Sequence, residues 1–250
     1  MSLAEEYRRQ LQWRDWGAMF RVLPALRGRT VIDLGCGVGD VAALLAGRGA
    51  KVVAVDGNEE LLAAARDRNA ANVELVHADL GALPELPRAH GLWCSFVAAY
   101  FVDLGPVLAH WTRTLEPGGW AAFVEVDDLF GHEPLPPEIR TVFDDYADDA
   151  LVHGRYDFNK GGKLRDELER AGFAIERELT LVDRELAFDG PALPPVVAAW
   201  RTRLDRLAQL RTRCGDDFEH VRDAFLATLA RADHKSRARV VGVLARAPGP

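Results

Sequence analysis

The chain has 250 residues, of which 48% are hydrophobic, and its 38 acidic and 31 basic residues give a formal net charge of −7. This length and composition suffice to bury the core of a single α/β domain. The net negative charge disfavours a nucleic-acid partner, because no global basic field would attract one. The N-terminus, Met1–Arg9, is charged, and no stretch approaches ~18 apolar residues, so we expect neither a signal peptide nor a membrane partner.

The cysteines are odd in number and far apart, without a C-x-x-C pair: Cys36, Cys94 and Cys214. This pattern is typical of a reducing compartment, so we expect a cytoplasmic protein without disulfides or structural zinc. Acidic residues at i,i+4 spacing within 144–149 indicate a solvated helix face rather than a cation site, because like charges at that spacing repel. We expect no metal.

Apolar runs alternate with helical patterns along the chain. The strand candidates are Val31–Leu34, Val52–Val55, Val73–His77, Leu92–Val97, Trp120–Val126, Phe173–Val182 and Arg239–Arg246. Predicted helices lie at Asp40–Arg48, Asn58–Arg68 and Pro106–Leu115, and further helical stretches fill residues 191–233. The alternation predicts an α/β fold with a doubly wound, mostly parallel seven-stranded sheet and helices on both faces.

The first strand runs directly into a turn with three glycines, Gly35-x-Gly37-x-Gly39, followed by a helical pattern. Such a turn lets a ligand approach the backbone closely. The second strand ends in Asp56, where a carboxylate would meet a ribose. Together these features indicate a nucleoside cofactor.

The spacing of the glycines distinguishes between nucleoside cofactors. A dinucleotide fingerprint reads G-x-G-x-x-G and places a pyrophosphate at the N-terminus of the next helix. This chain has Asp40 where the third dinucleotide glycine would stand, and a carboxylate there would repel a pyrophosphate. With Asp33 before the turn, the two acids suit S-adenosylmethionine, which has a cationic amino-acid end and no phosphate.

Read in order, these motifs resemble the class I S-adenosylmethionine-dependent methyltransferases. The matching segments are Asp33–Gly39, Asp56, His77–Leu80 and Leu115–Gly119. The resemblance implies that the glycine turn lies under the methionine part, that Asp56 binds both ribose hydroxyls, and that Asp79 accepts from the adenine amino group. It also implies that the last strand inserts antiparallel beside the sixth. The expected cofactor-binding residues are Asp33, Gly35, Cys36, Gly37, Gly39, Asp56, Gly57, Asn58, Asp79, Leu80 and Phe96, although helix capping explains Asn58 equally well.

We expect one methyltransferase domain over residues 1–250. Its parts are an N-terminal helical lid (1–27), a Rossmann-like core (28–186 and 236–250) and a helical insert (187–235). Tyr7, Trp13 or Arg14 of the lid is a candidate to close over the methionine end of the cofactor. Substrate selectivity is expected in the segments outside the common core, because ligands of open α/β sheets bind beyond the carboxyl ends of the strands.

Methyl transfer from a sulfonium needs mainly alignment, and a general base only where the attacking atom must lose a proton. The candidates for such a base follow the fifth strand: His132, Asp127 and Asp128. The alternative is that these are ordinary residues at the surface of the loop.

Candidate substrate-binding residues come from the loops and from the helical insert: Tyr100, His132, Tyr156, Trp200 and Arg201. The arginines of the insert, Arg201 and Arg203 among them, are a candidate clamp for a substrate carboxylate or phosphate. The alternative is a solvated face whose arginine stems cover apolar surface.

The sequence therefore predicts a methyltransferase that transfers a methyl group to a small-molecule acceptor by in-line displacement, leaving S-adenosylhomocysteine. A monomer and a homodimer both remain possible, as do oxygen, nitrogen and carbon as the acceptor atom. Two other classes stay open: a non-methylating S-adenosylmethionine-binding protein, and a nicotinamide-dependent oxidoreductase.

Overall fold

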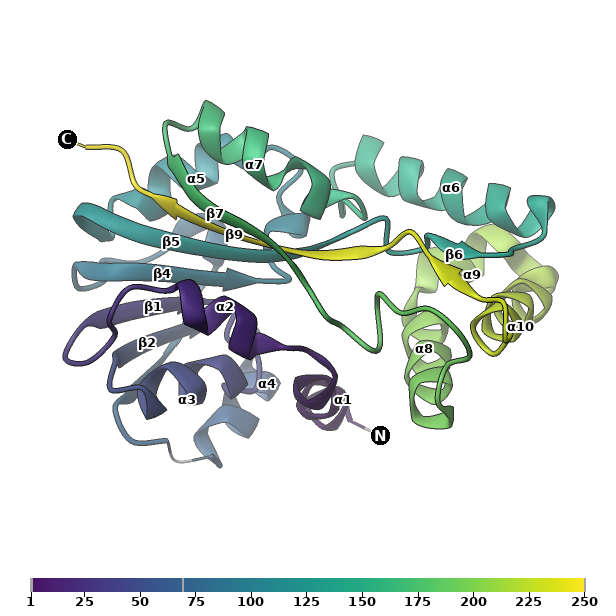
Figure 1. Ribbon diagram of the computed structural model, residues 1–250, viewed down its shortest axis with the longest axis horizontal. Coiled ribbons are helices and arrows are strands. Elements are labelled where there is room, and N and C mark those ends of the chain that lie inside the picture. Colours follow the sequence, from purple (N-terminus) through teal and green to yellow (C-terminus); the bar gives the residue numbers. More distant parts are fainter. Residues whose placement is uncertain (1, 69, 250) are drawn as a thin grey trace.

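Seven strands form one sheet in the order β3-β2-β1-β4-β5-β9-β7 in the computed structural model, which describes residues 2–68 and 70–249 (Figure 1). The strands are β1 (Thr30–Leu34), β2 (Lys51–Asp56), β3 (Val73–His77), β4 (Ala89–Ser95), β5 (Leu115–Asp127), β7 (Ala174–Leu181) and β9 (Arg239–Arg246). Neighbours among β1 to β5 pair in parallel, and β9 runs antiparallel between β5 and β7. The predicted fold class and the antiparallel last strand are confirmed. Residues 1 and 250, the ends of the predicted domain, lie outside the described residues.

Alternate residues of the strands face two separate halves of the core. Val31, Val52 and Ala54 pack with α2 (Trp16–Val22), α3 (Asp40–Gly47) and Leu62 of α4 (Glu59–Arg66). Ile32 and Val53 pack on the other face with α5 (Gly105–Thr112) and α7 (Lys160–Arg170). Because both faces are covered, the strands read as nearly continuous apolar runs, as parallel strands do.

Several boundaries differ from the sequence prediction, and the clearest differences are at β4, α5 and β5, which begins at Leu115 and not at Trp120. β4 ends at Ser95, not at Val97, because Phe96 adopts a φ of +57° and turns the chain out of the strand. The helix predicted to reach Leu115 ends at Thr112, and β5 begins at Leu115. The register between β4 and β5 shifts from Ala89↔Leu115 to Gly91↔Trp120, which accommodates the Pro117-Gly118-Gly119 segment within the strand.

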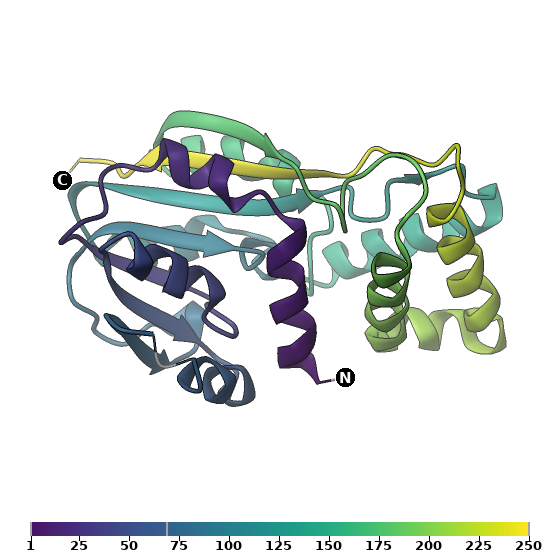
Figure 2. The same ribbon diagram turned by 60° about the horizontal axis from the view of Figure 1, so that its bottom comes forward.

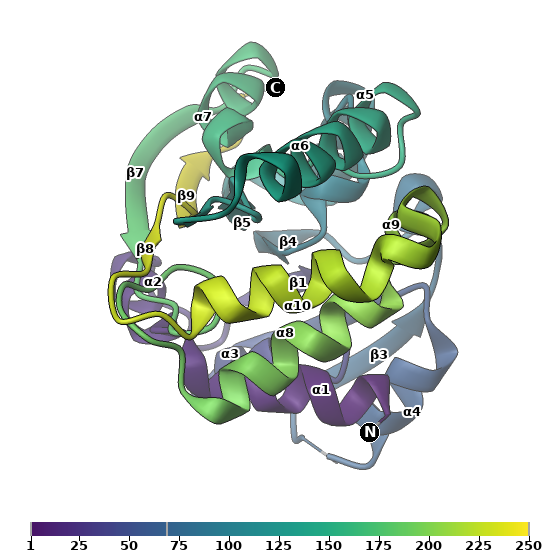
Figure 3. The ribbon, with the colours of Figure 1, turned by 90° about the vertical axis from the view of Figure 1, so that its right-hand side faces the viewer.

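The remaining elements gather beyond the carboxyl ends of the central strands (Figure 1). They are α1 (Leu3–Gln10), α6 (Pro137–Val152), α8 (Pro194–Arg206), α9 (Ala208–Cys214), α10 (Phe218–Leu229) and a small antiparallel sheet of β6 (His132–Glu133) and β8 (Lys235–Ser236). α1 is separate from α2 and lies beyond the carboxyl ends of the central strands (Figure 2). It lies along α8 (Figure 3), and an ion pair joins Glu6 to Arg206.

The segment predicted as an N-terminal helical lid contains more than one helix. α1 is followed by a single 3-10 turn (Leu11–Trp13) and then by α2. α2 packs on the sheet, where Phe20 stacks on Trp93 at 5.3 Å between ring centroids. Within residues 2–68 and 70–249, no helix is long and apolar enough to cross a membrane.

Candidate active site

The turn between β1 and α3 is held against the end of β2. Gly35 and Gly37 have φ values of +70° and +53°, which side chains other than glycine adopt rarely. The carbonyl of Val55 accepts from the amides of Gly35 (2.8 Å) and Cys36 (3.0 Å). The turn therefore lies directly beside the carboxyl end of β2.

Asp56 occupies that carboxyl end, and two backbone amides fix its carboxylate. Oδ2 accepts from the Gly37 amide at 2.7 Å, and Oδ1 accepts from the Asn58 amide at 2.9 Å. Asn58 is also the N-cap of α4, where its side chain accepts from the Leu61 amide at 3.1 Å. Each oxygen of Asp56 keeps lone-pair capacity for a ligand donor.

The end of β3 supplies a second carboxylate, that of Asp79. Its Oδ1 accepts from the Gly81 amide at 2.8 Å and starts the short turn Leu80–Ala82. Asp40, at the start of α3, forms an ion pair with Arg68. The glycine turn is therefore lined by carboxylates, and the arginine beside it is already paired.

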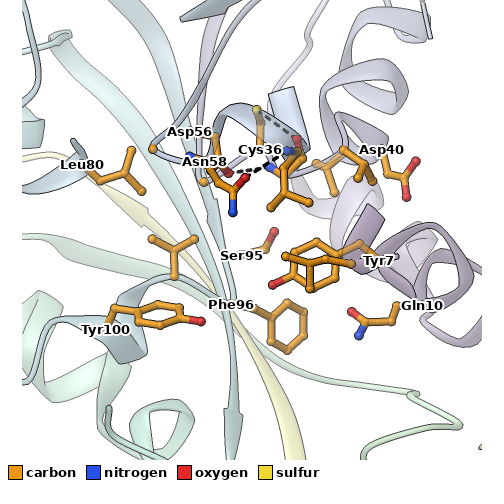
Figure 4. A pocket seen from close by; sticks show the side chains of 18 of the residues that line it. Tyr7, Gln10, Cys36, Asp40, Asp56, Asn58, Leu80, Ser95, Phe96 and Tyr100 are labelled. Atoms are coloured by element: carbon orange, nitrogen blue, oxygen red, sulfur yellow. Dashed lines mark hydrogen bonds between the residues drawn. The ribbon is translucent and has the colours of Figure 1, made fainter. Parts of the chain in front are cut away.

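A cavity of about 580 Å³ opens over these groups. Its first half is lined by the glycine turn, Asp56, Asn58, Asp79 and Leu80. Its second half is lined by aromatic and apolar side chains and two arginines: Tyr7, Leu11, Arg14, Trp16, Phe96, Tyr100, Val126, Leu129, Tyr156, Leu186 and Arg203. Figure 4 shows Asp56 and Asn58 on one side of this cavity and Phe96 and Tyr100 on another.

The predicted cofactor-binding residues line this cavity with two exceptions, Asp33 and Gly39. Asp33 is 1% exposed, and its burial, together with the nearby charge of Asp56, raises the pKa of its carboxyl to about 7. Gly39 has a φ of +75° as the N-cap of α3, and a Cβ there would approach Ala65 to 3.2 Å. Asp33 and Gly39 therefore pack within and beneath the turn and do not line the cavity.

The predicted base candidates do not reach the cavity. Asp127 pairs with Arg239, and Asp128 pairs with Arg237. His132 is fully buried in β6, where its Nδ1 lies 2.9 Å from Nε2 of His234. Burial lowers the pKa of His132 to about 3. None of the three lines the cavity, so the geometry offers no support for their predicted catalytic role.

The predicted substrate residues divide in two groups. Tyr100 and Tyr156 line the cavity, with their rings edge to face at 4.9 Å between centroids. Trp200 is fully buried and donates its indole N–H to the Glu185 carbonyl at 2.7 Å, while Arg201 pairs with Asp223 on the outside of α8. With His132, these two lie outside the lining.

Several lining residues were missed as site residues. Gln10 and Leu11 share the face of α1 and its extension that presents Tyr7 and Arg14, and i,i+3 and i,i+4 spacing from Tyr7 was the signal for them. Leu186 comes from the segment after β7, for which the sequence holds no comparable signal.

Comparisons with known proteins agree on the family. A methyltransferase-domain model matches residues 31–119. The ubiquinone biosynthesis O-methyltransferase of Thiobacillus denitrificans is 32% identical over 201 residues, covering 78% of this chain and 79% of that protein. The malonyl-[acyl-carrier protein] O-methyltransferase of Enterobacter lignolyticus is 34% identical over 115 residues, covering 46% of this chain. The matched region spans about half the length of such malonyl-[acyl-carrier protein] enzymes.

The solved structures show the same fold. An S-adenosylmethionine-dependent methyltransferase from Mesorhizobium loti superposes with a TM-score of 0.57 at 20% identity, covering 93% of this chain and 97% of that one. The family finding selects S-adenosylmethionine over a nicotinamide cofactor. The chain belongs to the class I S-adenosylmethionine-dependent methyltransferases.

Proposed function

We propose that this protein transfers the methyl group of S-adenosylmethionine to a small-molecule acceptor that binds in the same cavity. The observation that carries the proposal is the continuity of that cavity, whose one half holds the glycine turn and Asp56 and whose other half is lined by aromatic and apolar side chains. A ligand in the second half therefore lies beside a ligand in the first, which is the arrangement that direct group transfer requires.

The donor groups of the first half fit this cofactor. The two oxygens of Asp56, each held by one backbone amide, suit the two ribose hydroxyls. Asp79 retains an oxygen for the adenine amino group, and Leu80 and Phe101 offer apolar surface for the ring. The carboxylate-lined turn suits a cofactor without phosphates.

When bound, S-adenosylmethionine supplies an electrophilic methyl group, so the protein needs mainly to hold the acceptor in line with it. Positioning of this kind contributes ~7–11 kcal/mol to rate enhancement in well-aligned reactions. Tyr7 lies over the glycine turn, since a Cβ on Gly37 would approach its ring to 3.3 Å. α1 therefore helps to exclude water from the reacting groups.

The names of the relatives support oxygen as the acceptor atom. Both the ubiquinone biosynthesis enzyme and the malonyl-[acyl-carrier protein] enzyme are named as O-methyltransferases. We extend this to the present chain as part of the proposal. The proposal also includes a cytoplasmic location, a monomer or homodimer, and no nucleic-acid partner, in line with the net charge of −7.

Calorimetric titration with S-adenosylmethionine, S-adenosylhomocysteine and NADH in parallel tests the cofactor. Micromolar binding of the first two, without binding of NADH, is the expected result. Transfer of a labelled methyl group to members of a small-molecule panel then tests the reaction. Binding of NADH alone would contradict the proposal, and firm cofactor binding without any methyl acceptor would favour the non-methylating alternative.

A further inference from the structure

No carboxylate or histidine of the described residues lines the acceptor half of the cavity. Among the lining residues that the structure describes, the carboxylates are Asp40, Asp56 and Asp79, which all lie at the cofactor half, and no histidine is present. The ionisable groups of the acceptor half are Tyr100, Tyr156, Arg14 and Arg203, and Tyr7 lies over the glycine turn at its border with the cofactor half. This lining suits an acceptor whose attacking atom already carries no proton, because such an acceptor needs no general base.

The two arginines lie between the cavity and a pair of buried carboxylates. Asp183 and Glu185 are 0% and 1% exposed and do not line the cavity. Arg14 donates to Asp183 (2.6 Å), to Glu185 (3.4 Å) and to Gln10 (3.2 Å), and its guanidinium covers the ring of Phe96 at 4.2 Å. Three of the five Arg14 N–H donors, one on each nitrogen, are thus used within the protein.

Arg203 has donors to spare. Its Nη2 donates to Oε1 of Glu185, whereas its buried Nε has no hydrogen-bond partner among the described residues. A guanidinium carries five N–H donors in a fork that matches a carboxylate. The buried Nε is out of reach of a ligand in the cavity. Glu185 fixes the guanidinium at the cavity wall through one N–H of Nη2, and the donors left for a ligand are those of Nη1 and the second N–H of Nη2.

The tyrosines add neutral donors around the same space. Figure 4 shows the hydroxyls of Tyr7 and Tyr100 pointing toward one another from opposite walls. Burial raises the pKa of Tyr7 to about 12 and raises the pKa of Tyr156 well above its ordinary value. These hydroxyls accordingly stay protonated at neutral pH and donate hydrogen bonds; they do not act as bases.

We propose that the methyl acceptor is the carboxylate of a small apolar molecule, bound by Arg203 and by the hydroxyls of Tyr100 and Tyr156. A carboxylate is ionised at neutral pH without help, whereas a phenol or alcohol would need a base. The apolar body of the acceptor lies against Leu11, Leu129 and Leu186. This assignment rests on the proposed methyltransferase function and names its acceptor class.

The reaction balances without a proton acceptor. A carboxylate oxygen uses a lone pair to form the O–CH₃ bond, while the bond between that carbon and the donor sulfur breaks and its electron pair stays on sulfur. The products are a methyl ester and a neutral thioether, and no proton is released. Arg203 and the tyrosine hydroxyls bind the second carboxylate oxygen and thereby orient the first, reacting oxygen toward the methyl group.

The test compares matched ligands on protein saturated with S-adenosylhomocysteine. Benzoate, phenylacetate and octanoate are titrated beside their amides, with phenethylamine and 4-methylphenol as cationic and phenolic probes. At least one carboxylate should bind tenfold or more tightly than its amide and, with S-adenosylmethionine, give its methyl ester. Amides or the amine binding as tightly as every carboxylate would overturn the proposal, as would methylation of the phenol alone.

Arg201 provides a matched control, because it lies on the same helix but pairs with Asp223 outside the cavity. Arg203→Met should reduce the preference for carboxylate over amide at least tenfold, and Arg201→Met should leave it unchanged. Because loss of Arg203 leaves Glu185 with fewer partners, Tyr100→Phe and Tyr156→Phe are needed as milder variants. Each should weaken carboxylate binding three- to tenfold while the affinity for S-adenosylhomocysteine stays the same.

The affinity for S-adenosylhomocysteine distinguishes failure of the proposed methyltransferase function from failure of the acceptor assignment. Absence of its binding to the folded wild-type protein would refute the proposed function. Tight binding of S-adenosylhomocysteine without a preference for any carboxylate over its amide would refute the acceptor class alone. A carboxylate preference that survives both Arg203→Met and the tyrosine variants would refute the binding residues that we assign to it.

Discussion

At the scale of single residues, Asp56 shows how a short sequence pattern positions a functional group. The apolar run before it forms a buried strand, so the carboxylate lies where that strand ends. The backbone then completes the site, because the Gly37 amide reaches it from the neighbouring strand-to-helix turn. Both the strand and the glycines are readable from the sequence, so the place of Asp56 and much of this half of the cavity could be predicted, with Asp33 and Gly39 as exceptions.

Asp56→Ala should weaken binding of S-adenosylhomocysteine by ~1.5–3 kcal/mol, because hydrogen bonds to a charged group are lost. Calorimetric titration measures the change. Glu60→Gln, at an exposed position in the first turn of α4, is the control and should bind like the wild type. Wild-type affinity in the Asp56 variant would mean that the ribose lies elsewhere.

Gly35 is needed for both its backbone conformation and its lack of a side chain. An added Cβ would lie 2.1 Å from Cγ2 of Val97, and φ is +70°. We expect Gly35→Ala to lower the free energy of unfolding by roughly 2–4 kcal/mol, combining strain with overpacking. Gly28→Ala, with φ of +73° and no atom within 4 Å of the added Cβ, should show only the smaller strain effect in denaturant titrations. Equal losses in the two variants would refute the steric explanation.

At the scale of elements, the strands were predictable, but the acceptor half of the site was predictable only in part, through Tyr100 and Tyr156. Its walls depend on contacts between segments distant in sequence, such as Arg14 with Asp183. The phase of α8 around the buried Trp200 decides that Arg203 lines the cavity and Arg201 does not. Composition marked the arginine-rich stretch, but only the packing of α8 chooses among its arginines.

Arg14 joins the N-terminal segment to the chain after β7 through side chains that are nearly inaccessible to water. Its side chain is 6% exposed, and Asp183 is fully buried. Arg14→Met leaves buried carboxylates without this partner, so we expect a loss of about 3–5 kcal/mol in the free energy of unfolding. Arg21→Met is the control, because its ion pair with Asp15 is 3.7 Å long and largely exposed. It should change stability by less than about 1 kcal/mol in the same urea titration.

At the scale of the whole molecule, buried ionisable groups connect stability to pH. Burial raises the pKa of Asp33 to about 7 and that of Glu125 to about 8, and it lowers the pKa of His132 to about 3. The folded state resists ionisation of the two acids, so their contribution to stability is lost as pH rises. His132 acts in the opposite sense, because the unfolded chain binds a proton near pH 6.5 that the folded state excludes.

Glu125→Gln isolates one of these contributions. Glu125 is fully buried, and its Oε1 accepts from the Ala99 amide at 3.1 Å, which a glutamine oxygen can reproduce. The contribution of this raised pKa to the free energy of unfolding is fully present below about pH 4.5. It is lost as pH rises toward about 8, by at most ~1.4 kcal/mol per pH unit. The variant does not ionise. Between pH 5 and pH 8.5 its free energy of unfolding should therefore rise relative to that of the wild type by about 2 kcal/mol or more.

The contributions of Asp33 and His132 to the pH dependence are the same in both proteins and cancel in this difference. Glu138→Gln, at an exposed position on α6, is the control and should show no such change. Parallel pH profiles for Glu125→Gln and the wild type would mean that the carboxyl of Glu125 is not held neutral by the fold.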